Sequence, residues 1–120
     1  MDGAFPFAPI YGEHQVPILY LNSTRYLGCG PLLINQSTRD CYSMTVRGSG
    51  HYNFTDHTVY PLPMASMLLG SIDGEQALDI TNTVILSFFD KYLNNKSIDL
   101  IHLAKGFPEI ELYYDVNENQ

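Results

Sequence analysis

The chain has 120 residues, of which 45% are hydrophobic, 12% aromatic and 16% charged, a composition that excludes a disordered or collagen-like polymer and leaves room for one small domain. Six Lys and Arg against thirteen Asp and Glu give a formal net charge of −7, which argues against nucleic acid as a partner because this charge would repel phosphates. No apolar run approaches the roughly 20 residues that a membrane-spanning helix needs.

Two short segments predict β-strands. Residues 17–22 (PILYLN) form a continuous apolar run that opens at a proline, which is typical of a strand buried on both faces in a parallel sheet. Residues 42–47 (YSMTVR) are rich in β-branched and aromatic residues and stop at a Gly-Ser-Gly sequence. The gap of about 20 residues suits a crossover between parallel neighbours.

The most regular pattern begins at Asp73, and the chain from there predicts a long helix. Asp73 can accept from the first backbone N–H groups, Gln76 stands three positions later as in a capping box, and Asn94 with Asn95 supplies a left-handed stop. Apolar residues recur on one stripe at three- and four-residue intervals: Ala77, Leu78, Ile80, Val84, Ile85, Phe88, Phe89, Tyr92 and Leu93.

Two further segments have weaker signals. Residues 61–70 are apolar and opened by a proline, which favours a packed short helix or loop, with a lipid-facing lip as the alternative. The tail carries Glu109, Glu111, Asp115 and Glu118 and has no basic residue after Lys105. We therefore expect its end to be solvated and frayed.

The cysteines and asparagines bear on the compartment. Cys29 and Cys41 cannot by themselves form a structural zinc site, and both a disulfide and two thiols stay open. The N-terminal residues 1–6 lack the basic and apolar regions of a signal peptide, so any targeting information would lie outside this chain. Four N-x-[ST] tripeptides suggest a secreted protein, with the cytoplasm as the alternative: they begin at Asn22, Asn35, Asn53 and Asn95.

The segment that could carry chemistry is residues 45–56. A strand ends there, small residues allow a sharp turn, and His51 follows at the carboxyl edge, where open α/β sheets place ligands. An imidazole can act as a general base at neutral pH, although a histidine in this place can equally be a simple loop residue. His57 and Asp56 lie nearby without a second ligand cluster, so we predict no metal site.

The run RGSGHYNFTD, residues 47–56, resembles the catalytic-histidine segment of the plasma-type platelet-activating factor acetylhydrolases, which are serine esterases of the α/β-hydrolase fold. Residues 1–6 resemble the family's segment around its catalytic aspartate. Residues 72–73 and 77–82 resemble the stretch before its last long helix, so that the resemblance extends to about residue 95. It implies that Asp2 is the acid and His51 the base of a catalytic triad.

One departure from the family decides the expected extent of the fold. The nucleophile elbow of these enzymes, G-x-S-x-G, does not occur, and Ser49 and Ser71 follow Asp2, which the chain order forbids. The resemblance therefore implies the C-terminal part of an α/β-hydrolase sheet, with two to three parallel strands plus helices, incomplete as a stand-alone domain. In this single partial domain (1–120), residues 1–60 hold strands and triad loops, 61–95 the apolar segment and long helix, and 96–120 the acidic tail.

The implied activity is hydrolysis of a carboxylic ester, a phospholipid with a short or oxidised acyl chain, of the phospholipase A2-like type. The implied partners are this ester, the missing N-terminal part of the fold, and a membrane or lipoprotein surface in peripheral contact; no cofactor is implied. Without a nucleophilic serine, the chain alone is expected to be inactive. The alternative is a non-catalytic remnant that pairs through an exposed sheet edge, because strand 17–22 would leave such an edge open.

Overall fold

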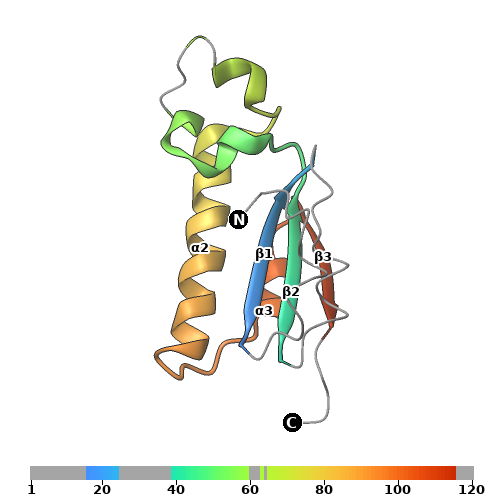
Figure 1. The fold of residues 1–120 in the computed structure, drawn as a ribbon, viewed down its shortest axis with the longest axis vertical. Helices are drawn as coiled ribbons and strands as arrows, with labels where there is room; N and C mark the ends of the chain where they lie inside the picture. Colours follow the sequence, from blue (N-terminus) through green and yellow to red (C-terminus); the bar gives the residue numbers. More distant parts are fainter. Residues whose placement is uncertain (1–15, 25–38, 60–62, 64, 116–120) are drawn as a thin grey trace.

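The computed structural model describes residues 16–24, 39–59, 63 and 65–115. Three strands form one mixed sheet in the order β1-β2-β3 (Figure 1). Strands β1 (Ile18–Ser23) and β2 (Cys41–Val46) are parallel, as the sequence predicts. The arrangement is compatible with an α/β fold.

The third strand differs from expectation. Residues 110–115 lie in the acidic tail, whose end is expected to be solvated, and they form the strand β3 (Ile110–Asp115). This strand pairs antiparallel with β2, from Val46↔Ile110 to Cys41↔Asp115. The expectation that all the strands are parallel is therefore wrong for β3. The alternating burial of its side chains explains this strand. Ile110 is buried, Glu111 is exposed and Leu112 is half-buried, which is the pattern of a strand with one covered face.

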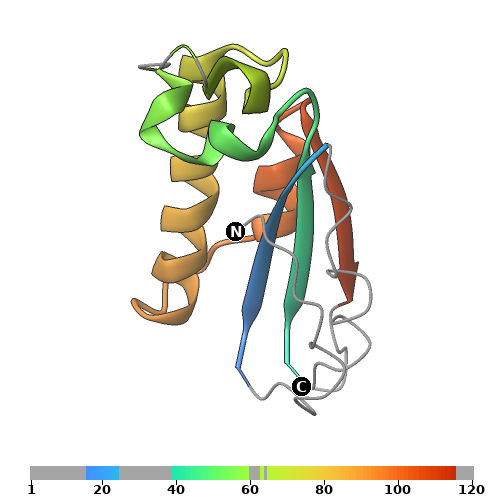
Figure 2. The same cartoon turned by 45° about the horizontal axis from the view of Figure 1, so that its top comes forward.

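Two helices cover one face of the sheet (Figures 1 and 2). They are the predicted long helix, α2 (Gly74–Tyr92), and a short helix, α3 (Leu100–Lys105). Tyr42, Met44 and Val46 alternate along β2 and point to this face, where they pack against both helices. The helical side of this core consists of Ile80 and Val84 from α2 and Leu100 and Ala104 from α3.

The predicted ends of α2 are confirmed in most details. The Asp73 side chain accepts a hydrogen bond from Gln76 N at 3.0 Å, as an N-cap does. The capping box is not closed, since Gln76 Nε2 lies 3.5 Å from Glu109 Oε1 and donates there. Past the helix, Asn95 adopts a left-handed conformation with φ 54°.

Three 3₁₀ turns lie between β2 and α2. They are η2 (His51–Phe54), η3 (Asp56–Thr58) and η4 (Ala65–Leu68). The short helix expected within residues 61–70 is thus η4, and it leaves Met67 77% exposed. Among the described residues, no helix is long and apolar enough to cross a membrane.

A tyrosine pair ties the end of α2 to the start of β2. Tyr92 donates its hydroxyl hydrogen to Asp40 Oδ2 at 2.6 Å, and the hydroxyls of Tyr42 and Tyr92 lie 2.8 Å apart. Lys91 Nζ donates to the Tyr42 hydroxyl at 3.4 Å. Burial, followed by the hydrogen bonds to Asp40 and Tyr42, raises the pKa of Tyr92 well above its ordinary value.

This pair predicts an alkaline limit to stability. Because the folded state raises the pKa of Tyr92, its contribution is complete below the unfolded pKa of about 10 and is lost as the pH rises further. We expect Tyr92→Phe to lower the free energy of unfolding at pH 7 by about 1 kcal/mol and to flatten its decline above pH 10. Urea unfolding measured from pH 7 to 11 tests this. Tyr52→Phe is the control and should leave that decline intact; an equal decline in Tyr92→Phe contradicts the prediction.

Candidate active site

The candidate site lies where the two parallel strands end. Thr24 follows β1, and residues 47–54, here named the histidine loop, follow β2. Because the strands are parallel, both carboxyl ends meet at one edge of the sheet, which is where α/β folds hold ligands. An open cavity of about 380 Å³ lies at this edge and is lined by Thr24, Gly48, Ser49, Leu69, Gly70 and Ser71.

Hydrogen bonds hold the floor of this cavity. Thr24 N donates to Ser49 O at 3.2 Å, and Thr24 Oγ1 donates to Val46 O at 3.1 Å. The buried Ser49 hydroxyl donates to the same Val46 carbonyl at 2.6 Å. The Ser49 hydroxyl therefore stabilises the turn that ends β2. This agrees with the sequence argument that it is not the nucleophile.

The histidine loop packs against residues 68–71 without room for side chains. A methyl group on Gly70 would overlap the Gly48 carbonyl oxygen, and one on Gly50 would lie 2.9 Å from Gly70 N. The two backbone segments are joined by the bond from Ile72 N to Gly48 O at 3.0 Å. Gly48 also has a positive φ of 77°, which glycine adopts at little cost. The glycines thus set the path of the chain into His51.

His51 begins η2 and is exposed to solvent. Its ring lies 5.9 Å from the Tyr52 ring, between centroids. The structure therefore places His51 directly beyond the carboxyl end of β2, as the sequence predicts. Asp2, the predicted acid, lies outside the described residues, so the pairing of the two side chains stays a prediction. Within the described part of the chain, no cluster of three or more His, Cys, Asp or Glu residues could hold a metal ion.

Asn53 is the residue of this site that the sequence analysis missed. It is only 2% exposed, and its Oδ1 accepts from Gly50 N at 2.7 Å and from Gly70 N at 2.8 Å. Its Nδ2 donates to Thr58 Oγ1 at 3.0 Å. The only available signal was the position of an Asn three residues after Gly50, where it can cap a turn.

The burial of Asn53 also bears on the N-x-[ST] tripeptides. Asn22 is likewise buried, and its Nδ2 donates to Ser43 Oγ at 3.0 Å. A glycan on Asn22 or Asn53 would have to replace these hydrogen bonds, so these two tripeptides do not support a secreted origin. Asn95 is exposed, and Asn35 lies outside the described residues.

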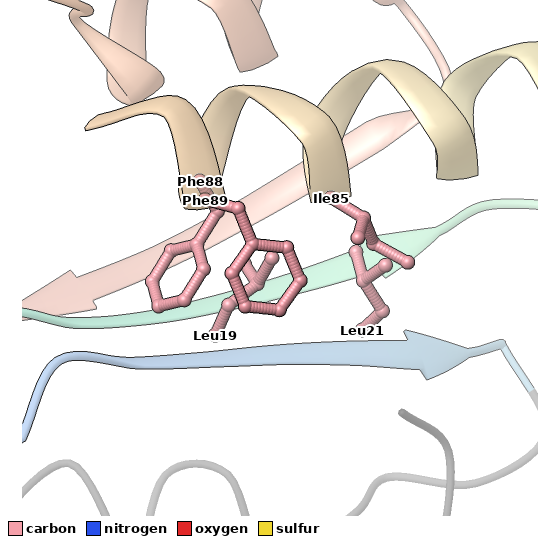
Figure 3. A pocket seen from close by; sticks show the side chains of 5 residues that line it. All are labelled: Leu19, Leu21, Ile85, Phe88 and Phe89. Atoms are coloured by element: carbon pink, nitrogen blue, oxygen red, sulfur yellow. The ribbon is translucent and has the colours of Figure 1, made fainter. Parts of the chain in front are cut away.

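A second cavity lies between β1 and α2, away from the polar edge. This apolar groove of about 270 Å³ is lined by Leu19 and Leu21 of β1 and by Ile85, Phe88 and Phe89 of α2. Figure 3 shows the rings of Phe88 and Phe89 beside Leu19, and Ile85 facing Leu21. The strand β1 borders the groove and is one of the two outer strands of the described sheet.

The similarity to known proteins agrees with the sequence motif. The chain is 30% identical over 94 residues to a platelet-activating factor acetylhydrolase of Canis lupus familiaris, a match that covers 70% of this chain and 20% of the relative. The corresponding proteins of Gallus gallus and Cavia porcellus are 29% and 30% identical, over 68% and 75% of this chain. The chain resembles the platelet-activating factor acetylhydrolases. The suspected family is thereby confirmed as the one to which this chain is similar.

The match covers only a small part of the relatives, which limits the conclusions about function. The chain spans about a fifth of the length of the curated relatives it matches. No protein-family model matches it. The similarity to platelet-activating factor acetylhydrolases therefore supports a relation to hydrolases.

The close contact of the two loops gives a direct test. We expect Gly70→Ala to force Gly48 and Ser49 away and to lower the free energy of unfolding by about 1–3 kcal/mol, with altered amide resonances in the histidine loop. Urea unfolding and two-dimensional NMR measure the two effects. The control is Gly106→Ala, since a methyl group there meets only Leu103 O at 3.2 Å in an ordinary helical conformation. Equal effects of the two variants would contradict the assigned contact.

Proposed function

We propose that the chain supplies the histidine and the aspartate of a serine carboxylic-ester hydrolase. The proposal is supported by one observation above all. The segment that resembles the catalytic-histidine motif of platelet-activating factor acetylhydrolases follows the parallel strand β2 and borders the cavity at the carboxyl edge of the sheet. The proposed fold is the C-terminal part of an α/β-hydrolase.

The proposed reaction is acyl transfer through serine. His51 takes the proton from a serine hydroxyl as its oxygen attacks the ester carbonyl, and returns that proton to the departing alcohol. Water then attacks the acyl-serine, again with His51 as base, and the carboxylic acid leaves. Asp2 accepts a hydrogen bond from the other ring nitrogen and holds the imidazole in one tautomer. The serine comes from outside this chain, and backbone N–H groups stabilise the oxyanion.

The proposed substrate is a phospholipid with a short or oxidised acyl chain. This step rests on the name of the relatives, whose acetylhydrolase activity concerns platelet-activating factor. The exposed Met67 and Leu68 of η4 are suited to peripheral contact with a membrane or lipoprotein surface. An extracellular location forms part of the proposal, with the cytoplasm as the alternative.

The catalytic role of His51 is tested in a version of the protein that also carries the N-terminal part of the fold. We expect His51→Ala to lower kcat on a chromogenic short-chain ester by several orders of magnitude, up to the roughly 10⁶-fold scale of removing a triad histidine. Asp2→Asn should act in the same direction. The control is His102→Ala, whose side chain is exposed on α3. Near-normal turnover by His51→Ala removes His51 from the mechanism.

The isolated chain and its gene give two further checks of this prediction. The 120-residue chain should not turn over the ester, and measurable turnover would show that the nucleophile has been misjudged. An in-frame G-x-S-x-G about 20 to 30 residues upstream of Asp2 supports the enzyme. A stop codon in that position supports a non-catalytic chain.

The second candidate is a non-catalytic module that pairs through the edge of β1 with a second copy. The observation that favours it is apolar surface beside that edge. Next to the apolar groove, Leu86 and Phe89 of α2 and Leu93, which follows the helix directly, are 66%, 49% and 70% exposed. Association of two copies on this side of the fold would cover the groove and the exposed apolar side chains beside it.

Sedimentation velocity distinguishes the two candidates. A pairing module should sediment as a dimer at micromolar concentration, and Phe89→Asp should convert it to a monomer because a charge would then be buried in the interface. The control is Met67→Asp, which alters a more exposed apolar side chain in η4 and should leave the dimer intact. A wild-type chain that stays monomeric at all concentrations excludes the second candidate.

A further inference from the structure

A closed pair of hydrogen bonds surrounds His51. Asn53 N donates to Gly50 O at 3.1 Å, and Gly50 N donates back to Asn53 Oδ1 at 2.7 Å. His51 and Tyr52 lie between these two residues in the chain. Asn53 therefore holds the short backbone segment that carries the imidazole, through one backbone and one side-chain hydrogen bond to Gly50.

The side-chain carboxamide of Asn53 also joins the histidine loop to two other parts of the fold. Asn53 Oδ1 also accepts from Gly70 N at 2.8 Å, which sets the loop against one wall of the cavity. Asn53 Nδ2 donates to the buried Thr58 Oγ1, which in turn donates to Gly74 O at 3.4 Å, at the first residue of α2. A side chain with an acceptor on one end and a donor on the other is needed for this arrangement.

The two ends of the amide have separable roles. The bonds of Oδ1 reach the residue directly before His51 and the wall of the cavity, whereas the bond of Nδ2 leads away to η3 and α2. Loss of the Nδ2 bond costs stability but leaves the path of the chain through Gly50 and His51 as it is. Loss of the Oδ1 bonds leaves the buried N–H group of Gly50 and the half-buried N–H group of Gly70 without their acceptor, and it releases this path.

We infer that Asn53 is the positioning residue of His51, and that it acts through its Oδ1 atom on Gly50 N and Gly70 N. This inference rests on the proposed role of His51 as the base. A base that is displaced by about 1 Å can lose about 100-fold in rate. Asn53 therefore affects proton transfer without contacting the substrate, and its removal should lower kcat while KM stays within about twofold.

Three variants separate positioning from stability. Asn53→Ala removes every side-chain bond, and Asn53→Asp keeps the two acceptor bonds of the carboxamide oxygen. Thr58→Val removes the acceptor of Nδ2 together with the bond to Gly74 O, and leaves the Oδ1 bonds in place. In the 120-residue chain, NMR reports amide hydrogen exchange at Gly50 and Gly70 and the line width of the His51 ring resonances. In the version with the N-terminal part of the fold, ester hydrolysis gives kcat and KM separately.

Asn53→Ala should speed exchange at Gly50 and Gly70 by about tenfold or more, broaden or shift the His51 signals, and lower kcat by about 100-fold. Asn53→Asp should restore exchange protection and most of kcat. Thr58→Val should lower the urea midpoint and leave the two amides, the His51 signals and kcat close to wild type.

Two results would overturn the inference: unchanged His51 signals in Asn53→Ala, or equal effects of Asn53→Ala and Thr58→Val on the amides and on His51. The inference and the proposed function fail separately. If His51→Ala keeps full activity, the catalytic role falls while the NMR data still decide whether Asn53 orders His51. If the Asn53 variants leave His51 ordered, the catalytic role stands without this positioning residue.

Discussion

The parallel pairing of β1 with β2 is the constraint on which the rest of the structure depends. Its register, from Ile18↔Cys41 to Ser23↔Val46, brings the carboxyl ends of both strands to one level. Thr24 can therefore bond to Ser49 and Val46, and the histidine loop begins beside it. A shift of one residue would turn Leu19 and Leu21 away from α2 and would separate the groups that line the polar cavity.

The sequence predicts those parts of the fold whose signals are local. The apolar run of β1, the β-branched residues of β2 and the stripe of α2 each lie within one element, and Asp73 caps its own helix. Strand β3 was missed because four acidic residues suggested a solvated tail. Its pairing with β2 joins residues more than 60 positions apart in the chain, and only the alternation of Ile110, Glu111 and Leu112 marks it locally.

The candidate site was predictable to a similar degree. The position of His51 can be predicted because the end of β2 and the small residues after it lie close to His51 in the sequence. The role of Asn53 is not visible in this way, because its partner Gly70 comes from another loop. Its tripeptide with Phe54 and Thr55 instead suggested a surface glycosylation site. Burial decides between these interpretations, and burial is a property of the assembled fold.

The two borders of the described sheet are chemically unequal. On one side, β3 carries the exposed Glu111, and a charge on an outer strand opposes the approach of another chain. On the other side, β1 adjoins an apolar groove. The apolar side chains beside β1 favour contact with further apolar surface, whereas the exposed carboxylate of Glu111 on β3 disfavours it.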